Sequence, residues 1–367
     1  MTQTTQTILR PAEWVTPGHP DKLADAVADR LVQAAQERQP EALCAIEVAV
    51  HRDVAYLTGR LACSGSDQLD LPALVRGVYA TAGHGKRWYP APGQVRVEGN
   101  LCVDELVPGE ELIRHLSDDQ SIVTGYANDL EGIGCIPPEQ WLAREWARRL
   151  WALREGPLEV CPDAKAAVLV EESPQGWRTT QCSASLLAPD GVCSVTLHRA
   201  ARECLQATLA DLVQRLPGFS AEEPALTVNG SGNYVIGGPE GDNGLSGKKL
   251  LLDYYGPRVP IGGSALCGKD FNKPDRAGAL IARQVALHVV RCGLAREATV
   301  TLLSLPGDDE PRVVRVQTEF GELSDPGRWN RLLDCRFAAV KDAWRGIELT
   351  EWARWGGLCA EAHLVSH

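Results

Sequence analysis

The sequence predicts an α+β protein whose helices and strands are mixed without a regular βαβ repeat. Short apolar runs rich in β-branched residues indicate strands, and longer segments with apolar residues every three or four positions indicate helices. Glycine is dense between 230 and 268, where loops are expected. The expected helices span about 20–37, 141–154, 199–215 and 274–291, and the expected strands span 43–50, 166–170, 192–198, 226–228 and 299–305.

The expected helices have recognisable ends. The first begins at Pro20 and the last at Pro274, which suit the first helical position because a missing N–H costs nothing there. The helix at 199–215 ends before Pro217, a residue that cannot continue a helix. Glu47 is the one acidic residue in the first expected strand. The glycine-rich and charged motifs therefore fall in loops or at helix starts.

Composition excludes several classes of function. At 367 residues the chain is long enough for two or three domains. Its net charge of -11 argues against non-specific nucleic-acid binding, which needs an excess of Lys and Arg. The twelve cysteines include no C-x-x-C pair, so we expect neither a zinc site nor a disulfide framework. No secretory signal or long apolar span is visible, and we expect a cytoplasmic protein without membrane contact.

Three short segments combine glycine or proline with charge. The first, GHPDK at 18–22, lies where a helix begins, and the positive end of a helix favours an anion. The alternative is an ordinary helix start with acidic capping. The second, GGPEGDNGLSGKK at 237–249, has five glycines that would let the backbone approach a ligand closely. Its alternative is a surface loop with solvated lysines.

The third segment, GSALCGKD at 263–270, differs from a Walker A loop at its last position, where Asp270 replaces Ser or Thr. A Walker A loop should follow a buried strand, and the preceding YYGPRVPI is unsuited to one. We therefore reject the P-loop interpretation. Together the three segments predict a polyphosphate site with magnesium. Its cations would be Lys22, Lys248, Lys249, Lys269, Lys273 and Arg276, and its acidic ligands Asp21 and Asp275.

These motifs resemble those of the S-adenosylmethionine synthetase family. The matching segments are GHPDK at 18–22, DDQSIVTGYA at 118–127, PDAK at 162–165, VIGGPEGDNGLSGKK at 235–249 and GGSALCGKDFNKPDR at 262–276. The resemblance implies three similar α/β domains in a pseudo-threefold arrangement, at 9–105, 112–235 and 236–360. It also implies a homodimer, or a dimer of dimers, with sheets packed at the dimer interface and active sites between subunits.

The implied reaction joins a thioether sulfur, that of L-methionine, to C5′ of ATP and releases phosphate and pyrophosphate. By matching position, His19, Lys22, Lys269 and Arg276 would be catalytic or phosphate contacts. Asp21 and Asp275 would hold two Mg²⁺ ions, and Glu13 and Glu47 match further acidic positions, Glu47 at a K⁺ site. The positions around the nucleotide and substrate are Asp119, Asp163, Lys165, Tyr234, Asp242, Lys248, Lys249, Ala265 and Lys273.

The departures from the family pattern lie at the amino-acid end. Arg60 stands where the family has a glutamate that holds the methionine ammonium, and the loop at about 99–117 is short. Asn233 and Lys248 replace arginines, and the last fifty residues match poorly. A thioether without an ammonium group is therefore an alternative substrate, with Arg60 as its carboxylate partner. A non-catalytic nucleotide-binding homologue is the other alternative.

Overall fold

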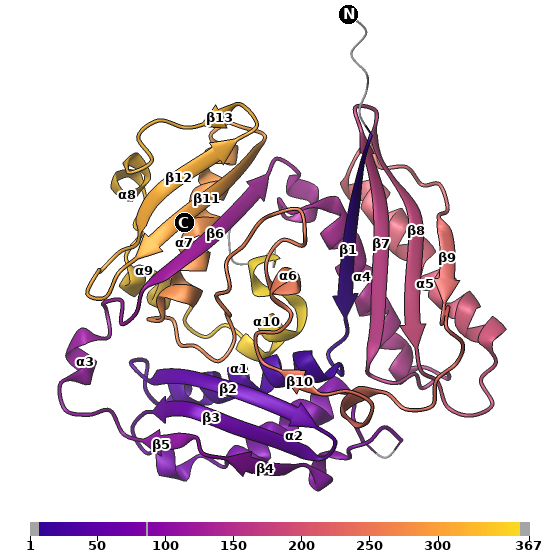
Figure 1. Ribbon diagram of the computed structural model, residues 1–367, viewed down its shortest axis with the longest axis horizontal. Helices are drawn as coiled ribbons and strands as arrows, with labels where there is room; N and C mark the ends of the chain where they lie inside the picture. The colour runs from indigo at the N-terminus through magenta and orange to yellow at the C-terminus, as the bar shows by residue number, and fades with distance from the viewer. Residues whose placement is uncertain (1–6, 86, 360–367) are drawn as a thin grey trace, which may run out of the picture.

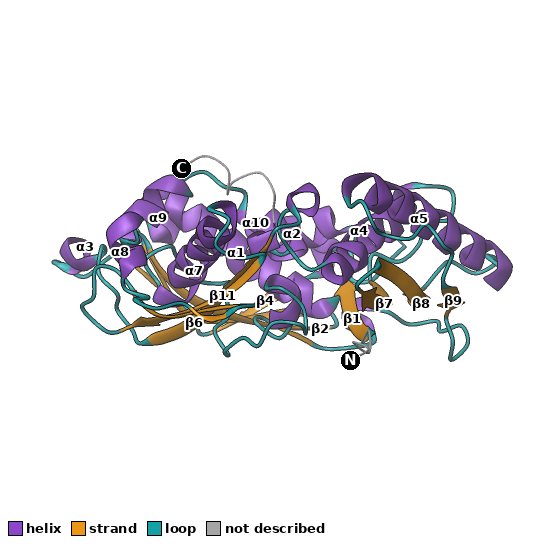
Figure 2. Cartoon of the chain, turned by 90° about the horizontal axis from the view of Figure 1, so that it is seen from above, coloured by secondary structure: helices purple, strands orange, loops and turns teal. Residues whose placement is uncertain are grey.

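The computed structural model describes residues 7–85 and 87–359. Its strands form three sheets that lie side by side in one layer, and the helices gather on one face of that layer (Figure 2). Seen onto the layer, the sheets surround a centre occupied by the short helices α6 (Leu250–Asp253) and α10 (Leu349–Trp355) (Figure 1). The predicted α+β fold with three sheet-and-helix units is confirmed.

The first sheet is built on the antiparallel hairpin of β2 and β3, and two further strands run parallel to β3. In spatial order its strands are β10 (Gly244–Leu245), β2 (Leu43–His51), β3 (Val54–Ala62) and β4 (Arg96–Gly99), with β5 (Cys102–Asp104) also beside β3. The helices of this unit are α1 (Pro20–Arg38) and α2 (Leu71–Ala82).

The other two sheets are likewise built on an antiparallel hairpin, but the third has no parallel pair among its described strands. The second contains β1 (Ile8–Val15), β7 (Ala164–Ser173), β8 (Gly176–Leu186) and β9 (Ala225–Val228), with α4 (Pro138–Ala152) and α5 (Ser194–Arg215). The third contains β13 (Gly321–Glu322), β12 (Arg312–Thr318), β11 (Glu297–Ser304) and β6 (Ser121–Asn128). Its helices are α7 (Pro274–Arg291), α8 (Arg328–Leu332) and α9 (Phe337–Ala343), and α3 (Glu110–Ile113) precedes β6.

Each sheet takes one strand from a distant part of the chain. β1 joins the second sheet, β6 joins the third and β10 joins the first. The exchange is cyclic, because each of the ranges 9–105, 112–235 and 236–360 donates one strand to the next unit. No cut between these ranges would separate three complete sheets, and the domain boundaries remain a prediction.

One sequence prediction is wrong. Residues 192–198 do not form a strand, because α5 begins at Ser194. β-branched residues suggested a strand, but Val195 is exposed and the inward positions follow a helical period. Ala201, Leu205 and Leu209 pack into the apolar core of the second unit, and this packing outweighs the local β preference.

The described residues contain no helix long and apolar enough to cross a membrane.

Candidate active site

His19 is the N-cap of α1 and is almost completely buried. Its Nδ1 accepts a hydrogen bond from the Asp21 backbone N–H at 3.2 Å, and its own backbone N–H donates to Thr16 O at 2.9 Å. A neutral imidazole carries one proton, so an accepting Nδ1 leaves that proton on Nε2. His19 therefore presents a fixed N–H donor beside the helix start.

The protonation state of His19 follows from its surroundings. Burial, together with the positive charges of Lys165, Lys249 and Lys248, lowers the pKa of His19 to about 2. An imidazolium among these ammonium groups would be strongly disfavoured. The residue is thus a neutral donor inside a cationic pocket, which suits an anionic ligand.

Asp21 lies within this pocket, buried at the first turn of α1. Its Oδ1 accepts the Leu245 backbone N–H at 3.1 Å and lies 3.6 Å from Lys248 Nζ. Its Oδ2 lies 3.4 Å from Lys249 Nζ. The 237–249 loop therefore brings its two lysines to the carboxylate of the GHPDK segment, as the sequence predicted for a common site.

Asp163 and Tyr234 lie on the same side of the molecule. Asp163 Oδ2 accepts the Gly238 N–H at 2.9 Å, while Oδ1 is buried without a hydrogen-bond partner among the described residues. Burial raises the pKa of Asp163 to about 6. A cavity of about 380 Å³ lies beside Tyr234, and Asn233, Trp88 and the 186–192 loop form its other walls. This cavity is large enough for part of a nucleotide.

A second cluster forms at the start of α7. Asp275 accepts from Ser121 Oγ at 2.5 Å and pairs with Lys269, and Lys273 Nζ lies 2.6 Å from Asp118 Oδ2. Burial opposes ionisation of Asp275, but hydrogen bonds from Lys269 and Ser121 lower its pKa overall. The Walker-like segment thus supplies a lysine and a carboxylate that hold each other, not a phosphate-binding P-loop.

Three aspartates on one face of α1 fix both glycine-rich segments. Asp21, Asp25 and Asp29 are four residues apart and accept backbone N–H groups from Leu245 at 3.1 Å, Gly247 at 2.8 Å and Gly268 at 2.9 Å, respectively. Asp25 and Asp29 were missed in the sequence. The signal was their spacing of four residues after GHPDK, which places acidic side chains on the buried face of an amphipathic helix.

Lys22 and Arg276 were expected around the phosphates, but here both point into the interior. Lys22 Nζ lies 2.5 Å from Asp253 Oδ1 and 3.1 Å from Asp25 Oδ2, with no side-chain exposure. Arg276 Nη2 lies 2.5 Å from Asp29 Oδ1 and is equally buried. A direct phosphate contact would require either cation to leave a buried carboxylate, which costs several kcal/mol, about 3–5.

The remaining predicted residues have individual positions. Glu47 accepts from Ser246 Oγ at 2.5 Å, and Ala265 lies against Gly247. Asp119 and Asp242 are exposed, and each accepts the backbone N–H of its following residue. Glu13 is exposed on β1. Arg60 forms ion pairs with Glu110 and Asp104.

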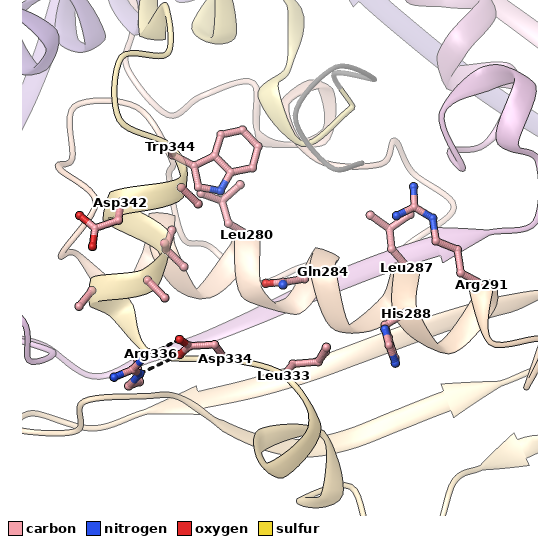
Figure 3. A pocket seen from close by; sticks show the side chains of 14 residues that line it. Leu280, Gln284, Leu287, His288, Arg291, Leu333, Asp334, Arg336, Asp342 and Trp344 are labelled. Carbon is pink, nitrogen blue, oxygen red and sulfur yellow. Dashed lines mark hydrogen bonds and ion pairs between the residues drawn. The ribbon is translucent and has the colours of Figure 1, made fainter. Parts of the chain in front are cut away.

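A further cavity lies away from all of these residues. It measures about 750 Å³ and opens between α7 and the 333–344 segment, with Leu280, Leu287 and Trp344 among its lining side chains (Figure 3). None of the predicted site residues lines it. The candidate site is therefore the cationic pocket at the start of α1, together with the cluster at the start of α7.

A buried neutral histidine among lysines, carried on a three-sheet α+β fold, is suited to binding a phosphorylated ligand. Family models described as the N-terminal and C-terminal domains of S-adenosylmethionine synthetase match residues 7–91 and 236–337. The S-adenosylmethionine synthase 1 of Rhodospirillum rubrum is 32% identical over 331 residues, covering 86% of this chain and 82% of the relative. The S-adenosylmethionine synthase of Deinococcus radiodurans is 31% identical over 359 residues, covering 90% and 87%. The chain belongs to the S-adenosylmethionine synthetase family.

Proposed function

We propose that this enzyme transfers the adenosyl group of ATP to the sulfur of L-methionine, giving S-adenosylmethionine, phosphate and pyrophosphate. The observation that carries the proposal is His19, a neutral Nε2–H donor held among Lys165, Lys248 and Lys249. A donor of this kind stabilises the negative charge that gathers on a leaving polyphosphate without itself titrating near neutral pH.

The reaction makes modest demands on acid–base chemistry. A thioether sulfur is a neutral nucleophile, so no general base is needed. A sulfur lone pair forms the bond to C5′ while the C5′–O bond breaks, and its electrons move onto the triphosphate. Water then hydrolyses the triphosphate to phosphate and pyrophosphate. The protein's tasks are to align sulfur with carbon and to stabilise the leaving oxygen. His19 would donate to that oxygen, and Lys165, Lys248 and Lys249 would neutralise the phosphates.

Different residues would bind the nucleoside and the amino acid. Asp163, Tyr234 and the neighbouring cavity of about 380 Å³ would receive the nucleoside. Asp119, Asp242 and Lys273 would contact the amino acid. Lys269 would complete the phosphate site once released from Asp275, because an incoming phosphate offers it a second anionic partner.

Magnesium is the metal that these residues fit. The described residues hold no group of three or more His, Cys, Asp or Glu side chains able to bind an ion. Mg²⁺ is usually held by one or two carboxylates together with substrate phosphates, so single carboxylates such as Asp21 and Asp275 are suitable ligands for two ions. When bound, Mg²⁺ would neutralise charge on the polyphosphate. Glu47 is the proposed K⁺ ligand, and Glu13 a further acidic position.

A homodimer, or a dimer of dimers, is the proposed assembly. The helices cover one face of the strand layer and leave the other face uncovered (Figure 2). Tyr56, Ile122 and Leu245 belong to three different strands, β3, β6 and β10, and are 43%, 62% and 47% exposed. Exposed apolar residues on an uncovered sheet are typical of an interface. Such packing would also allow two clusters of different subunits to face one another.

Product analysis tests the proposed reaction. The protein is incubated with ATP, Mg²⁺ and L-methionine, and mass spectrometry follows the sulfonium product while phosphate and pyrophosphate are assayed separately. We expect all three products in equal amounts, and none of the sulfonium without methionine. Release of γ-phosphate alone would contradict the proposal and favour a nucleotide hydrolase.

The sequence leaves a second candidate substrate open, a thioether that lacks the ammonium group. An arginine in place of the family glutamate would attract a carboxylate and repel an ammonium. The test compares L-methionine with 4-methylthio-2-oxobutanoate and methylthiopropionate at equal concentration. Full activity on methionine, with none on the other two compounds, would exclude this candidate.

A further inference from the structure

Arg60 is held by two acidic residues, Asp104 at the end of β5 and Glu110 in the segment that follows it. Its Nη1 and Nη2 lie 2.7 Å and 3.1 Å from the two oxygens of Glu110, and its Nε lies 3.2 Å from Asp104 Oδ1. The contact with Glu110 is bidentate, the geometry in which a guanidinium and a carboxylate bind most strongly. Three of the five N–H donors of the guanidinium are thus engaged within the chain.

Glu110 already occupies the Nη1–Nη2 edge of the guanidinium, so a substrate carboxylate would have to displace Glu110 to bind that edge in bidentate fashion. One cation and two carboxylates give the trio a net charge of -1, so the substitution of arginine for glutamate does not make this corner of the site positive. The Arg60 and Glu110 side chains are 28% and 23% exposed. Because the pair is partly buried, solvent screens its attraction less than it would screen that of a fully exposed pair.

The segment fastened by Arg60 reaches the predicted amino-acid site. Its far end is held by Arg114, whose Nη2 lies 2.6 Å from Asp270 Oδ1 and which also donates to the carbonyls of Glu41 and Ala42. Asp118, four residues on, pairs with Lys273 at 2.6 Å. Residues 104–118 therefore run from β3 to the start of α7, with ion pairs at both ends.

We propose that Arg60 is a positioning residue, which holds the 104–118 segment in place through Glu110 and Asp104 so that Asp118 and Lys273 are aligned at the amino-acid end. Arg60 then acts on methionine binding through this segment and does not contact the substrate. The inference rests on the proposed function, because it assigns the amino-acid end of that reaction to Lys273 and its neighbours. It also argues against Arg60 as a receptor for a substrate carboxylate.

A charge swap tests the proposal. Arg60→Glu, Glu110→Arg and the double variant are compared with the wild type for kcat, for KM of L-methionine and for KM of ATP. We expect each single variant to raise the KM of methionine by about ten-fold, a loss of roughly 1.4 kcal/mol, with the KM of ATP changed less than about two-fold. The double variant should recover to within about three-fold of the wild type. Arg60→Lys keeps the charge but loses the fork and should show a partial effect.

A matched control comes from the same sheet. Arg96 on β4 also pairs with two carboxylates, at 3.0 Å from Asp53 and 2.5 Å from Glu98, but it is exposed and fastens no segment near α7. Arg96→Glu should leave both KM values unchanged. Circular dichroism and thermal unfolding confirm that each variant is folded before its kinetics are compared.

The outcomes separate the inference from the proposed function. A wild type that forms no sulfonium product from any thioether contradicts the proposed function. An active wild type whose single swaps leave the KM of methionine unchanged, or whose double swap fails to recover it, overturns the positioning role. Loss of activity in Arg60→Glu that Glu110→Arg does not share would also overturn it, because only direct contact between Arg60 and the substrate explains that difference.

Discussion

His19 combines three features that a leaving-group donor needs. It is fixed by a backbone hydrogen bond to Nδ1, it is buried, and it is surrounded by ammonium groups that keep it neutral. A protonated histidine would add charge but would also bind the ground-state triphosphate, whereas a neutral, oriented N–H contributes most where charge develops. The side chain therefore acts on the transition state more than on ATP binding.

Replacement of His19 by alanine measures this contribution. We expect kcat to fall by about 10²–10³, because one preorganised donor to a developing oxyanion is lost. The KM of ATP should change little, because the lysines that neutralise the phosphates remain. Steady-state kinetics of sulfonium formation give both constants. His198→Ala, at a partly buried histidine of α5 whose Nε2 lies 3.5 Å from the Leu226 carbonyl, is the control and should retain full activity.

At the scale of elements, the position of α7 depends on a close contact with β6. A Cβ added at Gly125 would lie 2.1 Å from the backbone carbon of Ala282, so the strand and helix approach within a distance that only glycine permits. The first turn of α7 carries Asp275 and follows Lys273. A displacement of the helix axis would therefore move both residues of the second cluster.

Gly125→Ala should destabilise the protein and weaken its activity together. The added methyl group overpacks a backbone contact, for which we expect a loss of about 1–3 kcal/mol in the free energy of unfolding. Urea unfolding measures this loss. Gly77→Ala, within α2 and with open space around the added Cβ, is the matched control. It should be stabilised by about 0.5–1 kcal/mol, because alanine restricts the unfolded chain.

Elements were predictable where their signals are local, and less so where strands pair at long range. The helices at 20–37 and 274–291 follow from periodicity and from Pro20 and Pro274, and the structure confirms them. The pairing of β1 with β7 joins residues about 150 positions apart and leaves no local trace. Strand exchange among the three units was therefore beyond the sequence.

The site residues, too, were predictable only as far as local spacing indicates them. The motifs identified the residue types around His19 and Asp275, since those depend on spacing. They could not show that Lys22 turns inward, because its partner Asp253 comes from a different segment and only the fold brings the two together. The role of Arg60 likewise depends on its ion pair with Glu110, which lies fifty residues further along the chain.

Across the whole molecule, buried groups with lowered and with raised pKa values change the free energy of unfolding in opposite directions as the pH falls. Burial lowers the pKa of His19 to about 2 and that of His84 to about 4, so protonation of these residues in the unfolded chain destabilises the fold below about pH 6.5. Burial raises the pKa of Asp163 to about 6 and that of Asp253 to about 7, so the folded state takes up protons first and gains stability as pH falls through this range. The two effects oppose each other between about pH 6.5 and 4.

Removal of His84 should separate these effects. His84 Nδ1 and Nε2 lie 3.2 Å from the carbonyls of Tyr89 and Gly18, so the neutral ring can donate to only one of them. In the wild type, His84 does not reduce the free energy of unfolding above about pH 6.5. As the pH falls from 6.5 to about 4, protonation of His84 in the unfolded chain lowers that free energy progressively. In His84→Gln this loss is absent. We expect the variant, relative to the wild type, to gain about 2 kcal/mol between pH 7 and pH 5 in urea unfolding. His115→Gln, at an exposed histidine, should show no such gain, and an equal pH dependence of His84→Gln and wild type would contradict the assignment.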